Sequence, residues 1–264
     1  MAVISTICLT YNHFNFIADS IHGFALQNLS EKTEFLIFDD ASTDGTTLKI
    51  KEIIKDAPQG FEIKVIINDQ NIGLHGNFIN SLKSVKSDYI AICEGDDFWI
   101  DSNKLKLQKD FLDLNPDYSF CCTNIEVIND VGEKIPGAWP NKNKSFTLTK
   151  RALGTSLPVP TCSLFFRTSA ISGDNSFFHE LNNSPWPDFF LTSWLLTIGK
   201  GCFFEQKMAV YRQHGGGIYT SSNSATRLAK SKVTRRRILI FCLKRLKLFS
   251  ALICFKNMLK YPQF

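Results

Sequence analysis

The chain has 264 residues, 44% of them hydrophobic and 21% charged, which excludes a disordered or fibrous protein and fits one large globular domain, with or without an appendage. Its net charge of +5 conceals an asymmetry: residues 1–205 carry 17 basic and 25 acidic side chains, whereas residues 206–264 carry 13 basic side chains and no acidic one. We therefore expect the two parts to meet different partners.

The eight cysteines form no CxxC pair, and Cys8, Cys93 and Cys162 lie inside apolar runs, where free cysteine behaves as a small core residue. This usage predicts a reduced, cytoplasmic protein rather than a disulfide framework. The opening residues, MAVISTICLT, have neither a basic leader nor a small-residue cleavage site. We interpret them as a first strand rather than a signal peptide, so the protein is expected to stay inside the cell.

Strand-like and helix-like segments alternate through the first half of the chain. Apolar runs with β-branched residues predict strands and amphipathic stretches predict helices, in the order of repeated βα units on a largely parallel sheet. The predicted strands are residues 2–9, 34–38, 62–67 and 89–93, and the predicted helices are residues 16–26, 46–55, 74–85 and 104–114. This alternation predicts an α/β fold.

The second half of the chain changes character. Residues 118–135 are typical of strand, turn and strand, residues 138–150 are typical of a loop, and antiparallel pairing is expected to begin here. A helix is predicted after the prolines of SPWPDFF, and a strand over CFFEQKMAVYRQ that runs into three glycines. A boundary is expected near residues 219–225, which divides the chain into a domain over residues 1–219 and a basic helical tail over residues 220–264.

Three of the predicted strands end in polar residues: TYN at 10–12, DDASTDGT at 39–46 and EGDD at 94–97. Ligands of open α/β sheets bind outside the carboxyl ends of the strands, so these segments are expected to face one pocket. In EGDD, the carboxylates suit a hard divalent cation and Gly95 permits a tight turn. A solvated acidic turn that caps the helix near Lys104 explains the same residues equally well.

The segment DDASTDGT divides into two expected roles. Asp39, at the tip of its strand, is the candidate for accepting hydrogen bonds from a ligand. Residues 42–46 are expected mainly to cap the helix that follows, because Asp, Ser and Thr favour that position.

Four segments resemble glycosyltransferase family 2 in the order and spacing of its motifs, over about residues 2–217: VISTICLTYNHFNFIADSI, FLIFDDASTDGT, NIGLHGNFINSLKSVKSDYIAICEGDDFW and WPDFFLTSWLLTIGKGCFFEQKMAVYRQHGGG. The resemblance implies a GT-A fold, in which a Rossmann-like, mostly parallel sheet is flanked by helices, and a nucleotide-diphosphate sugar as donor. It also places the family's DxD element at Glu94 to Asp96, where Glu94 departs from the usual aspartate.

By this resemblance a set of residues would line the nucleotide and the donor sugar: Thr10, Tyr11, Asn12, Asp39, Asn71 and Glu94. Tyr11 would stack on or flank the base, Asp39 would accept from the base, and Glu94 would lie near the ribose. Asn71 belongs to NIGLHGN, for which a plain loop and helix cap is an equally open interpretation.

The resemblance also implies the groups that hold the metal and move the proton. Asp96 would bind the divalent ion, Mn²⁺ or Mg²⁺, and His214 would help to hold the metal or the diphosphate, with Arg212 paired to phosphate. Asp188 is the candidate general base on the acceptor hydroxyl, although a capping role at the start of its helix competes with this interpretation. Two carboxylates with these separate tasks imply inversion at the anomeric carbon. His13 has no assigned role.

Aromatic side chains are candidates for contacts with the sugar, because their faces suit the apolar faces of pyranose rings. Trp99 and Trp186 are assigned to a sugar site, with Trp186 on the acceptor side. Trp194 is assigned to the core.

The tail mixes basic residues with Ile, Leu and Phe. Lys244, Arg245 and Lys247 interrupt its apolar stretch, so it is not expected to span a bilayer. Two interpretations stay open: a basic amphipathic helix on an anionic membrane surface, or terminal helices packed on the body with a solvated basic face. The tail has no motif that reads nucleic acid, so no nucleic-acid partner is expected.

These observations together predict an inverting, metal-dependent glycosyltransferase of surface polysaccharide synthesis. It would move a sugar from a nucleotide diphosphate, UDP, to a hydroxyl of a glycan or lipid-linked acceptor, in the cytoplasm or at the cytoplasmic membrane face. One rival is a nucleotidyltransferase, although TYNHFN lacks the glycine-rich basic phosphate loop of that class. The other is a non-catalytic module that binds nucleotide sugars and docks on membranes through its tail.

Overall fold

The structure is a computed structural model that describes residues 2–28, 31–56, 62–137, 143–155, 157, 159–217 and 220–261. Within these residues nine strands form one sheet: β1 (Ile4–Thr10), β2 (Thr33–Asp39), β3 (Glu62–Ile67), β4 (Tyr89–Ile92), β5 (Phe98–Trp99), β6 (Tyr118–Asn129), β7 (Phe146–Leu148), β8 (Phe165–Arg167) and β9 (Lys200–Gln213). Their order is β3-β2-β1-β4-β8-β6-β9-β5, and β7 pairs with β9.

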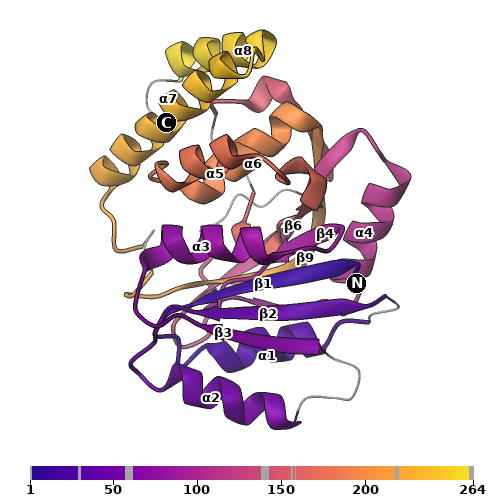
Figure 1. Ribbon diagram of the computed structural model, residues 1–264, viewed down its shortest axis with the longest axis vertical. Coiled ribbons are helices and arrows are strands. Elements are labelled where there is room, and N and C mark those ends of the chain that lie inside the picture. Colours follow the sequence, from indigo (N-terminus) through magenta and orange to yellow (C-terminus); the bar gives the residue numbers. More distant parts are fainter. Residues whose placement is uncertain are drawn as a thin grey trace.

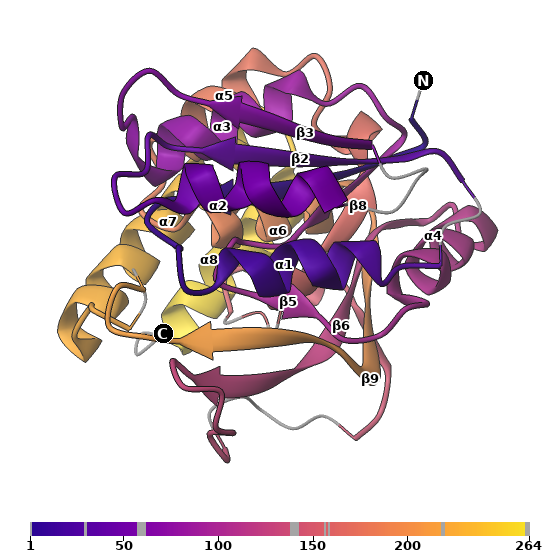
Figure 2. The same ribbon diagram turned by 90° about the horizontal axis from the view of Figure 1, so that it is seen from below.

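Helices cover both faces of this sheet (Figures 1 and 2). They are α1 (Ile17–Ala25), α2 (Thr46–Ile53), α3 (Gly73–Ser84), α4 (Lys104–Leu114), α5 (Asn175–Asn182), α6 (Pro187–Ile198), α7 (Ser224–Lys244) and α8 (Leu248–Lys260). In Figure 1, α3, α5 and α6 lie above the sheet with α7 and α8 beyond them, and α1 and α2 lie below it. The chain therefore builds a helix–sheet–helix sandwich, with α7 and α8 as an additional outer layer on one side.

Alternating residues of the central strand enter two separate cores. In β1, Ile7 and Leu9 face the cluster that α3, α5, α6, α7 and α8 complete. Cys8, between them, faces the cluster of α1 and α4. Because successive side chains of a strand point to opposite faces, a strand buried on both sides is apolar throughout, as the first half of the sequence predicts.

Strand register brings the polar strand ends to one edge of the sheet. β1 pairs in parallel with both β2 and β4, and Thr10 lies opposite Asp39. The segment after β4 continues beside β1, where the Gly95 amide donates to the Leu9 carbonyl at 2.9 Å. The three polar segments expected to share a pocket therefore start side by side.

The α/β fold predicted from the sequence is confirmed, and several elements match their predicted positions closely. The strand over residues 62–67 and the helix over residues 104–114 have the predicted bounds. Antiparallel pairing does begin in the second half, because β8 runs antiparallel to both β4 and β6. Since β6 and β9 pair in parallel again, the sheet is mixed.

Three parts of the second half differ from prediction. The strand, turn and strand expected over residues 118–135 are one strand, β6, followed by an isolated bridge between Ile128 and Lys134. The expected loop over residues 138–150 contains β7, whose Phe146 ring stacks on Phe203 of β9 with ring centroids 4.9 Å apart. Residues 138–142 of that loop lie outside the described residues. Helix α5 was not predicted; Phe177 and Leu181 of this short helix are buried in the core above the sheet.

The basic tail forms α7 and α8, which pack onto the body through Ile238, Phe241 and Ala251, in the same core cluster as α6. Residue 219, where the domain boundary was expected, lies outside the described residues, so the division into two domains stays a prediction. Among the described residues no helix is long and apolar enough to cross a membrane.

Candidate functional site

The acidic loop after β4 lies directly against the end of β1. A Cβ atom at Gly95 would come within 2.7 Å of the Thr10 hydroxyl oxygen and 3.0 Å of His13 Nδ1. Only glycine permits so close an approach, because every other residue would push these groups away. Gly95 therefore holds the acidic side chains next to the segment that follows β1.

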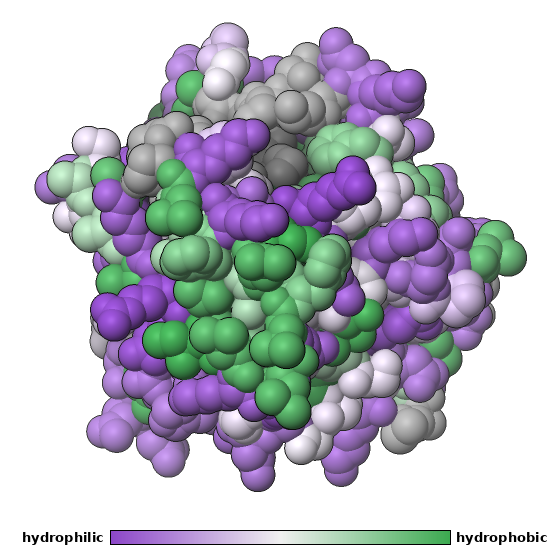
Figure 3. Space-filling view, turned by 90° about the horizontal axis from the view of Figure 1, so that it is seen from above, coloured by the Kyte–Doolittle hydropathy of each residue, from purple (hydrophilic) through white to green (hydrophobic). Residues whose placement is uncertain are grey.

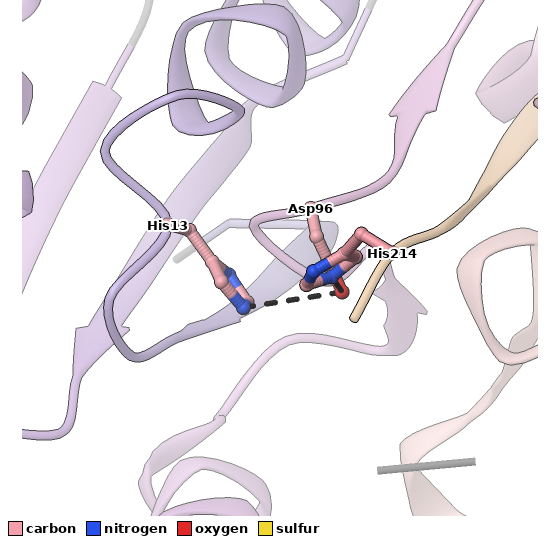
Figure 4. Close-up of side chains that lie close together, drawn as sticks. All are labelled: His13, Asp96 and His214. Atoms are coloured by element: carbon pink, nitrogen blue, oxygen red, sulfur yellow. Dashed lines mark hydrogen bonds and ion pairs between the residues drawn. The ribbon is translucent and has the colours of Figure 1, made fainter. Parts of the chain in front are cut away.

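Three side chains from distant segments meet at this edge: His13 after β1, Asp96 after β4 and His214 after β9 (Figure 4). Asp96 Oδ2 lies 2.9 Å from His214 Nε2 and 3.9 Å from His13 Nε2. One ligand atom from each residue lies within 4.8 Å of the other two. Two imidazoles and a carboxylate in this arrangement form a candidate metal site.

The electrostatics of Asp96 and His13 suit ligation. Burial acts to raise the pKa of Asp96, but its interactions with the His13 and His214 imidazoles outweigh burial, so the pKa lies below the ordinary value. Burial lowers the pKa of His13, which favours the neutral imidazole. An ionised carboxylate and a neutral imidazole are the forms that bind metal ions.

The other two carboxylates of the loop lie in different surroundings. Burial and the charges of Asp96 and Asp188 raise the pKa of Glu94 to about 8, and Glu94 Oε2 is buried with no hydrogen-bond partner in the described part of the chain. Asp97 is buried and accepts a hydrogen bond of 2.8 Å from the backbone amide of Arg212. Asp97 therefore ties the end of β9 to the acidic loop.

Asp188 lies at the start of α6, directly after Pro187 at the first helical position. Burial raises its pKa above the ordinary value, and the Thr161 hydroxyl lies 3.5 Å from its Oδ2. The charge of Asp188 also contributes to the raised pKa of Glu94, so Asp188 acts electrostatically on the acidic loop from the opposite half of the chain.

The residues expected around the nucleotide differ in their exposure and in their hydrogen bonds within the protein. Thr10 has a buried hydroxyl without a partner among the described residues, and Tyr11 is 42% exposed. Asn12 adopts φ 56° and its Oδ1 accepts from the Thr43 amide at 2.8 Å, which ties the loops after β1 and β2 together. Asn71 Oδ1 accepts from the Gly73 amide at 3.0 Å, within its own turn.

Asp39 is fully buried and already receives three hydrogen bonds from its own loop. Its Oδ1 accepts from the Ser42 amide at 3.1 Å and from the Ser42 hydroxyl at 2.5 Å, and its Oδ2 accepts from the Thr47 hydroxyl. Ser42 therefore serves Asp39 in this structure, whereas Asp44 caps α2 by accepting from the Thr46 amide at 2.9 Å.

The structure corrects one aromatic assignment. Trp99 is 2% exposed and donates from Nε1 to the Cys162 carbonyl at 2.7 Å, so it packs in the core and does not line a sugar site. Trp194 is buried in the core, as predicted. The Trp186 backbone amide, two residues before Asp188, donates to the Thr234 hydroxyl of α7 at 3.2 Å.

Arg212 and His13 also occupy positions that the sequence did not indicate. Arg212 forms an ion pair of 2.6 Å with Asp19 and stacks on Phe16, so its guanidinium is engaged within the protein.

His13 is a site residue to which the sequence assigns no role. Its position directly after TYN, in a strand-end segment already expected to face the pocket, was the available signal.

Comparisons with known proteins identify the family and the fold. The sequence matches Glycosyl transferase family 2 over residues 5–172. An uncharacterized protein of Mycobacterium tuberculosis, Rv1520, is 33% identical over 218 residues, which are 83% of this chain and 61% of that protein. The Escherichia coli UDP-Glc:alpha-D-GlcNAc-diphosphoundecaprenol beta-1,3-glucosyltransferase WfgD is 32% identical over 128 residues, 48% of this chain and 47% of WfgD. The chain thus spans less than two thirds of the length of these relatives.

Solved structures share the fold at low sequence identity. TarS 1-349 of S. aureus in complex with UDP-GlcNAc superposes with a TM-score of 0.69 at 17% identity, over 98% of this chain and 73% of that one. The mannosyltransferase PcManGT of Pyrobaculum calidifontis, in complex with GDP-Man and Mn²⁺, superposes with a TM-score of 0.63 at 12% identity, over 99% and 75%. The fold is thus of the GT-A type. Because the family match covers more than half of the sequence, the chain belongs to glycosyl transferase family 2.

Proposed function

We propose that this chain is an inverting, metal-dependent glycosyltransferase that moves a sugar from UDP to a hydroxyl of a glycan or lipid-linked acceptor in surface polysaccharide synthesis. The observation that carries the proposal is the meeting of His13, Asp96 and His214 in a chain of glycosyl transferase family 2. Relatives support the substrate classes: the name of WfgD specifies UDP-Glc and a sugar on diphosphoundecaprenol, and structures of TarS contain UDP or UDP-GlcNAc.

The three side chains fit a divalent ion, Mn²⁺ or Mg²⁺. Ligands that bind an ion at about 2.1 Å from opposite sides lie about 4.2 Å apart, so the observed separations of up to 4.8 Å need only small side-chain adjustments. Two imidazoles beside one carboxylate favour Mn²⁺ over Mg²⁺, which prefers oxygen ligands. A bound ion supplies Lewis-acid stabilisation of the negative charge that builds on the departing diphosphate.

Asp188 is the proposed general base. It would accept the proton of the acceptor hydroxyl as that oxygen attacks the anomeric carbon on the face opposite the diphosphate, and the configuration would therefore invert. Its raised pKa, caused by burial, makes it a stronger base than an exposed aspartate. The contact with the Thr161 hydroxyl, at 3.5 Å, is too long to hold the carboxylate firmly.

The proposed nucleotide site includes side chains with and without hydrogen-bond partners in the described part of the protein. They are Thr10, Tyr11, Asn12, Asp39, Asn71 and Glu94. Tyr11 offers an exposed ring for the base. Asp39 retains lone pairs beside its three internal hydrogen bonds, because an ionised carboxylate accepts at about four positions. We place the reaction on the cytoplasmic side, which suits eight cysteines that are all free and buried.

The proposal is tested by incubating the full chain with a panel of nucleotide sugars in Mn²⁺, in Mg²⁺ and in chelator, while diphosphate release and the anomeric configuration of the product are followed. Asp188→Asn should reduce turnover by about 10²–10⁴-fold and leave binding of the UDP-sugar unchanged. Because burial raises the pKa of Asp188, the acid limb of the wild-type kcat/KM profile should lie above the ordinary carboxyl value of about 4.

Asp130, which is exposed, provides the matched control: Asp130→Asn should keep full turnover. Retained turnover in Asp188→Asn would remove this residue from the base role. A product with retained configuration, or turnover that chelator does not reduce, would refute the inverting, metal-dependent mechanism.

A further inference from the structure

The inner faces of α7 and α8 are occupied by the body of the protein. Ile238 and Phe241 of α7 and Ala251 and Cys254 of α8 belong to the core cluster above the sheet. Basic side chains of α7 are also held there, since Arg237 and Lys244 both pair with Glu180. The helical hairpin formed by α7 and α8 is therefore a fixed part of the fold, and only its outer surface is free to meet a partner.

The outer surface of α8 carries a row of large apolar side chains. Leu248, Leu252, Phe255 and Leu259 are spaced by four, three and four residues, so they lie along one side of the helix. They are 64, 50, 48 and 68% exposed, respectively. We call these four residues the outer row. Figure 3, which faces this end of the molecule, shows apolar side chains gathered together and bordered by hydrophilic ones.

Further exposed apolar residues continue the outer row. Phe249 is 68% exposed, Leu246 in the turn between the helices is 82% exposed, and Leu243 at the end of α7 is 49% exposed. Exposed apolar groups gathered in this way mark an interaction surface.

The charges beside the outer row indicate the kind of partner. Lys256 and Lys260 are exposed on the same helix, and Arg236 is exposed on α7. Residues 206–264 contain no acidic side chain to neutralise them. A second copy of the chain would bring these cations against one another, which is unfavourable. A negatively charged partner with an apolar interior satisfies both features.

We infer that α8 docks on the surface of an anionic phospholipid bilayer, with the outer row inserted among the acyl chains and Lys256 and Lys260 at the lipid phosphates. An amphipathic helix binds in this way, parallel to the membrane plane, while lysine side chains extend to the headgroups. The absence of a helix that could cross a membrane among the described residues agrees with surface binding.

The hairpin also connects this surface to the acceptor side of the proposed active site. Lys230 of α7 lies over the ring of Trp186, 4.9 Å from its centroid, and Trp186 is two residues from Asp188. Docking through α8 would therefore hold the proposed base near the bilayer, where a lipid-linked acceptor resides. This last step rests on the proposed function, whereas membrane binding itself does not.

The test is flotation of the full chain with vesicles of phosphatidylcholine alone or mixed with phosphatidylglycerol. We expect binding to the anionic vesicles only, weakened by salt. The double variant Leu252→Ser, Leu259→Ser and the double variant Lys256→Gln, Lys260→Gln should each bind on the order of tenfold or more weakly. Leu114→Ser with Val131→Ser is the matched control, because Leu114 and Val131 are 82 and 74% exposed on other elements.

Each outcome separates this inference from its rivals. Equal binding to neutral vesicles, no binding to anionic ones, or unchanged binding of both double variants would overturn it. Concentration-dependent dimers without lipid, abolished by the outer-row variant, would assign the surface to a second copy instead. All of these variants should keep wild-type hydrolysis of a soluble donor, so a failure of membrane binding is distinguishable from a failure of the proposed catalysis.

Discussion

The loops after β2 and β4 look alike in sequence but differ in how their carboxylates are satisfied. Asp39, at the end of β2, receives its hydrogen bonds from Ser42 and Thr47 of its own loop and helix. Asp96, in the loop after β4, faces two histidines from distant parts of the chain. A carboxylate satisfied by its own segment stabilises local structure, whereas one that faces remote imidazoles is available to a cation.

The largest expected effect comes from removing one carboxylate from each loop. Asp96→Asn should weaken Mn²⁺ binding, measured by calorimetric titration, on the order of 100-fold or more, because the charged ligand is lost. Asp39→Asn should leave Mn²⁺ affinity unchanged and lower the free energy of unfolding by about 1–3 kcal/mol, measured by urea denaturation. Equal losses of metal affinity in the two variants would break the comparison.

A smaller effect is expected for the ligand that only the structure revealed. His13→Ala should weaken Mn²⁺ binding on the order of 10-fold, because Asp96 and His214 remain to hold the ion. The exposed His22, on α1, gives the control variant His22→Ala, which should bind Mn²⁺ as the wild type does. If both variants bind Mn²⁺ with wild-type affinity, His13 is not a ligand.

The smallest expected effect on metal binding comes from replacing one glycine in each loop. Gly95→Ala should lower the free energy of unfolding by about 1–3 kcal/mol and also weaken Mn²⁺ binding, because the new methyl group displaces Thr10 and His13. Gly45→Ala, at φ 95°, should cost about 1–2 kcal/mol of stability, because the backbone is strained and the new methyl group would lie 3.3 Å from the Phe14 ring, and it should leave Mn²⁺ binding unchanged. Loss of metal binding in Gly45→Ala would show that the two loops are not independent.

The sequence by itself determined the layered α/β fold. Apolar strand segments alternate with amphipathic helical segments along the chain, and each kind of segment is recognised from neighbouring residues alone. The spacing of apolar side chains in residues 104–114 was sufficient to locate a helix. The polar ends of three strands were sufficient to locate the edge of the sheet where the site lies. The family motifs likewise drew Asp96 and His214 into one hypothesis, and the structure places them 2.9 Å apart.

Only the tertiary structure decided which groups meet across long separations. His13 joins Asp96 and His214, two residues 118 positions apart, because β1, β4 and β9 all end at one edge of the sheet. The position of His13 after TYN indicates the pocket but not a ligand role, just as nothing local shows that Trp99 is buried or that Asp39 is satisfied within its own loop. The two interpretations of the tail follow the same rule. Its apolar residues are divided between the core and the outer row by the packing of α7 and α8 on the body, and composition alone carries no information about that division.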